Sequence, residues 1–257
     1  KGSYSLSKPI PNLNAIYFNN GVKKNFHIQK NHQALLTKTD TAQFYSKKTI
    51  NTEDRTMALT LYTNTQSRGV VVDWLILDLG IEVERIEVAY GTEMKSPEFL
   101  KLNPFGKVPV LVDGDVVIYE LDAICAYLAD KFFEKGLAPA LNDPKRGLYY
   151  RWLFFGAGPF AAASDNEHLK VQVAPEQKMF MGYGDYQDTY QALIQGLEQA
   201  SPYLCGSQFT AADISLGAMI MWQLKMNLLK PHPAIERYVL AIQQRESLKN
   251  NPALFAA

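Results

Sequence analysis

Apolar residues recur with two different spacings in the stretch that follows residue 57. Residues 59–62 and 84–88 alternate or cluster apolar side chains over four or five positions, as half-buried strands do. Between them, a helix is predicted to begin at Ser67, because Val71, Trp74, Leu75 and Leu79 follow at three- and four-residue spacing, and Gly80 comes next. Glycine just past such a run is typical of a helix end. We therefore predict a strand–helix–strand unit.

A second group of elements follows at once. Two β-branched runs, residues 108–112 and 116–119, flank the dipeptide Asp113-Gly114. An Asp-Gly pair between such runs predicts a tight antiparallel hairpin. The helical spacing returns over residues 121–132. Together with the first unit, this order predicts an α/β domain with a mixed four-stranded sheet and helices packed on it.

The remaining chain has no strand pattern. Residues 136–142 contain Gly and Pro and are predicted to be a linker, after which residues 143–257 follow a helical pattern. Phe209 precedes Thr210, and Asp213 follows three positions later, which is the spacing of a helix-capping box with an apolar staple onto Ile214. We predict an all-helical second domain.

Residues 1–56 differ in composition from the rest. They contain eight lysines and one arginine against Asp40, Glu53 and Asp54, although the whole chain has a formal net charge of zero. Asn, Ser, Thr and Gln are abundant and no periodicity is sustained. We predict a disordered leader, or translated upstream sequence with Met57 as the functional start. A basic arm that meets nucleic acid or an acidic partner is the alternative.

Length and composition limit the class of protein. The chain has 257 residues, of which 47% are hydrophobic, enough for two ordinary cores. No run of eighteen apolar residues and no secretory signal is found, so no membrane span and no export are expected. Cys125 and Cys205 are too few for a disulfide framework and indicate a cytoplasmic location.

The stretch from Asn103 to Leu111, followed by Glu120 and the helical residues 123–128, resembles the glutathione-binding core of the glutathione S-transferase family, with a serine-type, bacterial-like, theta/phi-like N-terminal motif. The resemblance implies a thioredoxin-like glutathione-binding domain over residues 57–135 and the all-helical domain over residues 143–257. It also implies glutathione as a co-substrate and a homodimer.

A transferase of this kind must ionise the glutathione thiol, because the thiolate is the nucleophile. By the resemblance, Ser67 is the residue that stabilises the thiolate. Its hydroxyl would lie at a helix start, where the helix dipole contributes about 0.3–1 kcal/mol to anion binding and a hydrogen bond contributes more. Taken alone, Ser67 would read as an ordinary helix cap. Tyr62, Thr65 and Arg68 are the other polar candidates nearby.

Other residues are assigned to the tripeptide by the same resemblance. Val108 would pair its backbone with the cysteinyl part of glutathione, held by a cis peptide to Pro109. Glu120 would receive the γ-glutamyl ammonium group. Lys95 and Lys107 would meet the glycine carboxylate, although a solvated surface lysine is the alternative for either one.

Two positions depart from the family pattern. Leu121 stands where many members have Ser or Thr, so that only its backbone N–H is left to bind the γ-glutamyl carboxylate. Met94 stands where some serine-type relatives have a histidine. Modest glutathione affinity is therefore expected.

The second substrate is expected to be a small hydrophobic electrophile bound against the helical domain. Aromatic residues crowd the start of that domain and either line such a pocket or form core, namely Tyr149, Tyr150, Trp152, Phe154, Phe155 and Phe160. The four histidines have no metal-ligand spacing, and no dinucleotide motif occurs.

The functional prediction is thus a glutathione S-transferase. Peroxidase or isomerase activity of the same fold stays open, and a non-catalytic glutathione-binding or scaffold protein is the alternative.

Overall fold

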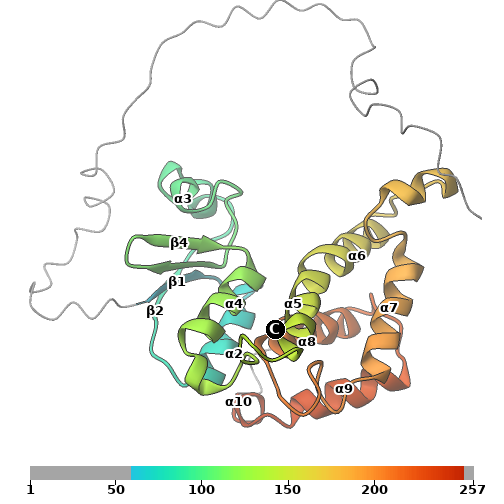
Figure 1. Cartoon of the computed structure of the whole chain (residues 1–257). Helices are drawn as coiled ribbons and strands as arrows, with labels where there is room; N and C mark the ends of the chain where they lie inside the picture. Colours follow the sequence, from blue (N-terminus) through green and yellow to red (C-terminus); the bar gives the residue numbers. More distant parts are fainter. Residues whose placement is uncertain (1–58, 252–257) are drawn as a thin grey trace, which may run out of the picture. The chain divides into compact units, whose positions relative to one another are not determined.

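The computed structural model describes residues 59–251, so the predicted leader and Met57 lie outside the described residues. Figure 1 labels the elements. The first part of the described chain contains β1 (Thr60–Thr63), α2 (Gly69–Leu79), β2 (Glu84–Glu87), the 3₁₀ turn η2 (Glu93–Lys95), α3 (Pro97–Leu102), β3 (Val110–Asp113), β4 (Val116–Tyr119), α4 (Leu121–Lys131) and η3 (Phe133–Lys135). The second part contains α5 (Lys145–Phe155), the π-helix η4 (Gly156–Phe160), α6 (Ala161–His168), η5 (Pro175–Phe180), α7 (Tyr186–Glu198), α8 (Ala211–Lys225), α9 (Pro233–Gln243) and α10 (Glu246–Lys249).

The four strands form one mixed sheet in the order β2-β1-β3-β4. β1 runs parallel to β2 and antiparallel to β3, and β3 pairs with β4 as a hairpin. The predicted sheet and the all-helical second part are confirmed. The turn differs by one position, because Asp113 pairs with Val116 and the two turn residues are Gly114 and Asp115.

Alternate residues of the strands face two separate cores. Leu61 and Leu111 are fully buried in the large cluster that includes α2, α4 and the helical part. Tyr62 and Val110 belong instead to a smaller cluster with Phe99 of α3. The side-chain period of two in a strand therefore places α3 on one face of the sheet and α2 and α4 on the other.

The first helix starts two residues later than predicted. Gly69 is its first helical residue, Arg68 is the N-cap, and Gly80 ends it in the left-handed conformation. Ser67 lies just outside the helix, where its side chain is available to the unpaired N–H groups of the first turn.

The predicted capping device in the helical part is present. The Thr210 N–H donates to Asp213 Oδ2 over 2.9 Å, and the other carboxylate oxygen accepts from the Leu204 N–H and from Tyr238 Oη. Burial raises the pKa of Asp213 to about 6.

The π-helical turn η4 was not predicted from the sequence. Pro159 lies in this turn, between α5 and α6, where it interrupts the regular helical pattern.

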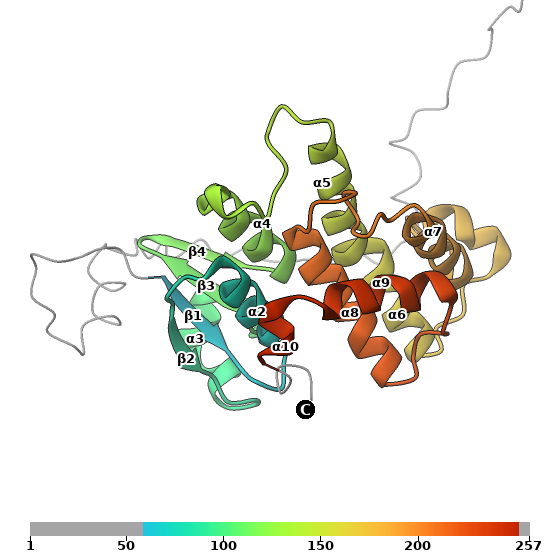
Figure 2. The same cartoon turned by 90° about the horizontal axis from the view of Figure 1, so that it is seen from below.

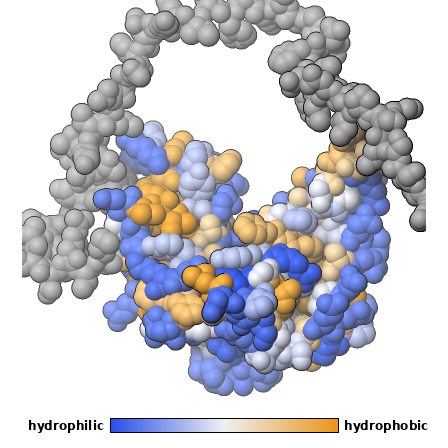
Figure 3. All heavy atoms as spheres, in the orientation of Figure 1, coloured by the Kyte–Doolittle hydropathy of each residue, from blue (hydrophilic) through white to orange (hydrophobic). Residues whose placement is uncertain are grey.

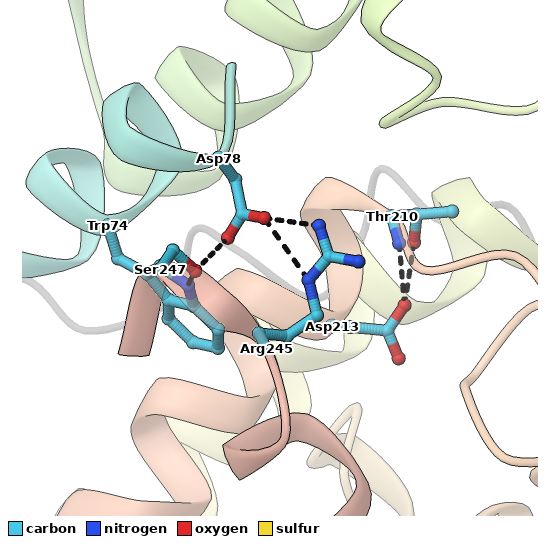
Figure 4. Close-up of polar contacts among 6 residues, drawn as sticks. All are labelled: Trp74, Asp78, Thr210, Asp213, Arg245 and Ser247. Atoms are coloured by element: carbon cyan, nitrogen blue, oxygen red, sulfur yellow. Dashed lines mark hydrogen bonds and ion pairs between the residues drawn. The ribbon is translucent and has the colours of Figure 1, made fainter. Parts of the chain in front are cut away.

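A polar cluster ties α2 to the last helix. Asp78 of α2 accepts hydrogen bonds from the Arg245 guanidinium and, over 2.7 Å, from Ser247 Oγ. Trp74 Nε1 donates to the same Ser247 oxygen over 3.0 Å. Figure 4 shows this chain of contacts, and Figures 1 and 2 both place α10 beside α2.

Within residues 59–251 no helix is long and apolar enough to cross a membrane.

This cluster gives a stability prediction. Asp78→Ala should lower the free energy of unfolding by about 2–4 kcal/mol, because the Asp78 side chain is almost fully buried and its loss leaves the Arg245 cation without its partner. Urea unfolding followed by circular dichroism measures the change. Asp73→Ala is the matched control on the same helix, since its ion pair with Arg85 is more exposed and should contribute no more than about 1 kcal/mol. Equal losses in the two variants would contradict the prediction.

Candidate functional site

The Ser67 hydroxyl lies at the start of α2. Its proton is donated to the Asn64 carbonyl over 2.7 Å, and its oxygen accepts from the Gly69 N–H over 2.9 Å. The residue therefore satisfies one of the amides at the helix start, as the capping interpretation predicts. The same contact holds a hydroxyl at the end of the helix that carries a partial positive charge.

Asn64 fixes the loop that carries Ser67. Its Nδ2 donates to the Val88 carbonyl at the end of β2, and its Oδ1 accepts from the Gln66 N–H, both over 3.0 Å. Tyr90 Oη adds a hydrogen bond to the Gln66 carbonyl over 3.1 Å. We did not predict this role for Asn64, although an asparagine directly after a strand is a recognisable signal for such a side-chain turn.

The structure separates Ser67 from the rival donors. The Tyr62 ring is buried and packs on Phe99, with ring centroids 6.1 Å apart, on the α3 face of the sheet. Thr65 and Arg68 are exposed. Ser67 is thus the residue in this loop whose hydroxyl is held at the helix start, while Arg68 extends from the N-cap position next to it.

A second loop, residues 103–109, is organised by one buried side chain. Asn103 Nδ2 donates to the Lys107 carbonyl over 2.8 Å, and its Oδ1 accepts from the Phe105 N–H over 3.0 Å. The Val108–Pro109 peptide is cis, as the family resemblance implied. Val108 precedes β3, and within residues 59–251 nothing is hydrogen-bonded to its N–H or carbonyl.

The two lysines predicted to bind the glycine carboxylate differ in their surroundings. Lys95 Nζ donates to the carbonyls of Phe105 and Gly106, over 2.7 and 3.1 Å, so most of its donor capacity is used within the protein. Gly106 is required there, because a Cβ would lie 2.4 Å from the Met94 carbonyl oxygen. Lys107 is exposed and leaves its ammonium group to solvent or a ligand. Of the two, Lys107 fits an anion-binding role better.

Glu120 has a backbone conformation that side chains rarely adopt. Its φ is +76°, and it is the N-cap of α4 without using its own side chain as the cap. Such conformations cost of order 1–3 kcal/mol and cluster at functional positions. The exposed carboxylate therefore projects from a fixed point at the start of the helix. Leu121 is the first helical residue, and the departure Met94 is buried among apolar side chains.

Asp122 was not predicted to have a special environment. Its side chain is partly buried where α4 meets the helical part, and Ser215 Oγ of α8 donates to the carboxylate over 2.7 Å. Burial raises the pKa of Asp122 to about 6, although the Ser215 hydrogen bond and the Arg68 charge act in the opposite direction. An acidic residue in a first helical turn is usually exposed, so the sequence carried no signal of this burial.

The raised pKa predicts a pH-dependent stability. The folded state holds a proton on Asp122 up to about pH 6, whereas the unfolded state releases it near pH 4, so the carboxyl's contribution is lost as pH rises between these values. Relative to Asp122→Asn, which stays neutral, the free energy of unfolding of the wild-type protein should fall by about 2–3 kcal/mol from about pH 4 to about pH 7. Urea unfolding at both pH values measures it. Parallel pH profiles for the two proteins would show that Asp122 titrates normally.

The aromatic cluster divides into two groups. Tyr149, Trp152 and Phe160 are buried and belong to the large core, as the core interpretation predicts. Phe154 is 72% exposed and Tyr150 is 38% exposed, while Phe155 stacks on Phe160 with centroids 5.9 Å apart. The exposed rings are thus the members that remain available to an apolar ligand.

The cysteines are not placed for thiol chemistry. Cys125 and Cys205 are both buried and unpaired. Burial raises the pKa of Cys125 well above its usual value and that of Cys205 to about 11, so neither thiol ionises readily. The described part of the chain contains no group of three His, Cys, Asp or Glu side chains that could hold a metal ion.

Comparison with known proteins defines the class. Residues 57–130 match the family described as glutathione S-transferase, N-terminal domain, and residues 177–250 match glutathione S-transferase, C-terminal domain. Glutathione S-transferase 3 from Zea mays is 43% identical over 169 residues, covering 60% of this chain and 73% of the relative. Glutathione S-transferase F10 from Arabidopsis thaliana is 36% identical over 178 residues, covering 62% and 78%.

Solved structures agree with this class. A glutathione transferase from Methylococcus capsulatus str. Bath has a TM-score of 0.62 at 24% identity, covering 78% of this chain and 100% of that one, and shows the fold. A theta class glutathione S-transferase from Xanthomonas axonopodis pv. citri, with glutathione bound, has a TM-score of 0.59 at 26% identity, covering 75% and 96%. The chain belongs to the glutathione S-transferase family, and its enzyme class is glutathione transferase.

Proposed function

We propose that this protein ionises the thiol of glutathione at the start of α2 and directs the thiolate at a small hydrophobic electrophile. The observation that carries the proposal is the Ser67 hydroxyl, held against the first turn of an eleven-residue helix by the Gly69 N–H. A hydroxyl that donates to sulfur and a helix dipole both favour the thiolate over the thiol. Glutathione-bound relatives, such as the Xanthomonas enzyme, support the choice of tripeptide.

In the proposed reaction, the Ser67 hydroxyl rotates so that its proton turns from the Asn64 carbonyl to the incoming sulfur. The Asn64 carbonyl keeps one donor, because it still accepts a hydrogen bond from the Ser67 N–H over 3.0 Å. The sulfur proton leaves to solvent, the thiolate attacks the electrophilic carbon, and the leaving group departs with its electron pair. Ser67 remains protonated throughout and stabilises the negative charge on sulfur.

Ser67→Ala should raise the thiol pKa of bound glutathione by about one to two units, because a hydrogen bond to a charged group contributes about 1.5–3 kcal/mol. The ultraviolet absorbance of the thiolate as a function of pH measures this shift. Thr65→Ala is the matched control in the same loop, and its exposed side chain should leave the thiol pKa unchanged. A pKa that is unshifted in the wild-type protein would favour a non-catalytic binding protein.

Separate groups of the protein bind the different parts of glutathione. In this proposal the unpaired N–H and carbonyl of Val108 pair with the cysteinyl residue in a β-like manner, beside the cis peptide to Pro109. Glu120 accepts the γ-glutamyl ammonium group. The γ-glutamyl carboxylate meets the Leu121 N–H and the Arg68 guanidinium, which replaces part of the hydrogen bonding lost with the Ser or Thr of other members. Lys107 binds the glycine carboxylate, and Lys95 supports the loop.

Glu120→Gln should weaken glutathione binding about tenfold, because an ion pair with the ammonium group becomes a neutral hydrogen bond. Isothermal titration with glutathione measures the dissociation constant. Glu98→Gln, an exposed carboxylate on α3, is the control and should bind as the wild type does. If both variants bind alike, the ammonium group lies elsewhere.

Assembly and location belong to the same proposal. A homodimer is supported by the family and by apolar surface: Figure 3 shows hydrophobic side chains gathered where Figure 1 places the edge strand β4, on which Val116 is 52% exposed. Sedimentation equilibrium distinguishes a dimer from a monomer of 28.9 kDa.

Two buried free thiols support a cytoplasmic location, which cell fractionation tests.

A further inference from the structure

A second hydroxyl lies behind Ser67, on the last residue of β1. Thr63 is 2% exposed, and its Oγ1 has no hydrogen-bond partner in the part of the chain that the structure describes. Buried hydroxyls are nearly always hydrogen-bonded, because an unpaired one destabilises the folded state. The unpaired Thr63 hydroxyl is therefore an exception among buried side chains.

Thr63 and Ser67 border the same small space. Gly69 has no side chain, and the point where its Cβ would lie is 2.0 Å from Thr63 Oγ1 and 3.1 Å from Ser67 Oγ. Both hydroxyl oxygens thus adjoin one notch beside the first residue of α2. In the structure described here they are not hydrogen-bonded to each other.

The hydrogen-bonding capacities of the two hydroxyls are complementary. A serine oxygen has two lone pairs and one proton. Ser67 uses its proton on the Asn64 carbonyl and one lone pair on the Gly69 N–H, and the second lone pair has no donor among residues 59–251. Thr63 has a proton with no acceptor there. An unused donor and an unused acceptor face the same notch.

Resting on the proposed role of Ser67, we propose that Thr63 is a positioning residue for thiolate stabilisation. When Ser67 turns its proton to the glutathione sulfur, the Thr63 hydroxyl donates to Ser67 Oγ and fills its second lone pair. No covalent bond changes in this step. A hydroxyl that accepts a hydrogen bond is a stronger donor, because hydrogen bonds in a chain polarise one another.

Thr63→Val tests the proposal, since valine keeps the shape of threonine and removes the hydroxyl. The thiol pKa of bound glutathione, measured by thiolate absorbance, should rise by about 0.3 to 1 unit, a twofold to tenfold loss in the ionisation constant. Thr63→Ser keeps the hydroxyl and should retain most of the wild-type pKa. Thr60→Val makes the same replacement at the other end of β1 and should leave the pKa unchanged.

Thermal unfolding of each variant separates a structural effect from a positioning one. Thr63→Val should unfold at the same or a higher temperature than the wild type, because it removes an unpaired buried hydroxyl. A raised thiol pKa in a variant of unchanged or higher stability is the expected result. Should Thr63→Val fail to fold, Thr63→Ala against Thr63→Ser makes the same comparison of hydroxyl and no hydroxyl.

The outcomes distinguish this proposal from the function on which it rests. If Ser67→Ala raises the thiol pKa and Thr63→Val does not, Thr63 has no positioning role although the proposed function stands. If the wild-type protein itself shows an unshifted thiol, both are overturned.

Discussion

Residue 69 can carry no side chain, because Thr63 Oγ1 occupies the space only 2.0 Å from the point where its Cβ would lie. Because Gly69 has no side chain, the start of α2 can approach the end of β1. The approach brings the Gly69 N–H within 2.9 Å of the Ser67 oxygen and so places a hydroxyl at the positive end of the helix. A larger residue at position 69 would push the helix from the strand and move Ser67 with it.

The proposed glutathione site is formed by loops that polar side chains hold in place. Asn64 ties the Ser67 loop to the end of β2, and Asn103 with Lys95 shapes the loop before the cis peptide. Glu120 starts α4 with a positive φ. These anchors form within the thioredoxin-like domain. Asp122 and Asp78 then connect the same helices to the helical part, through Ser215 and Arg245. The site and the domain contact therefore share α2 and α4.

Local patterns predicted most of the fold. The Asp-Gly pair predicted the hairpin, Gly80 the end of α2, and the spacing of Thr210 and Asp213 the cap of α8, because each depends on neighbouring residues. Contacts between segments far apart in the chain could not be predicted from patterns of neighbouring residues. The Asp78 and Arg245 pair joins residues 167 positions apart, and the partly buried Asp122 meets Ser215 of α8, 93 positions along the chain.

The candidate site shows the same difference between local signals and contacts that depend on folding. The family resemblance pointed to Ser67, Val108, Pro109 and Glu120. It gave no sign that Lys95 donates to two backbone carbonyls, because that contact depends on how the following loop folds back.

The central claim is that glutathione binds with its thiol ionised. Calorimetric titration in buffers of different ionisation enthalpy counts the protons released when a ligand binds. At a pH about one unit below the pKa of a free thiol, glutathione should release about 0.4 to 0.8 of a proton more than S-methylglutathione, which has no thiol proton, if its thiol pKa falls by about one to two units on binding. Equal proton release by the two ligands would show that the sulfur stays protonated and would contradict the account.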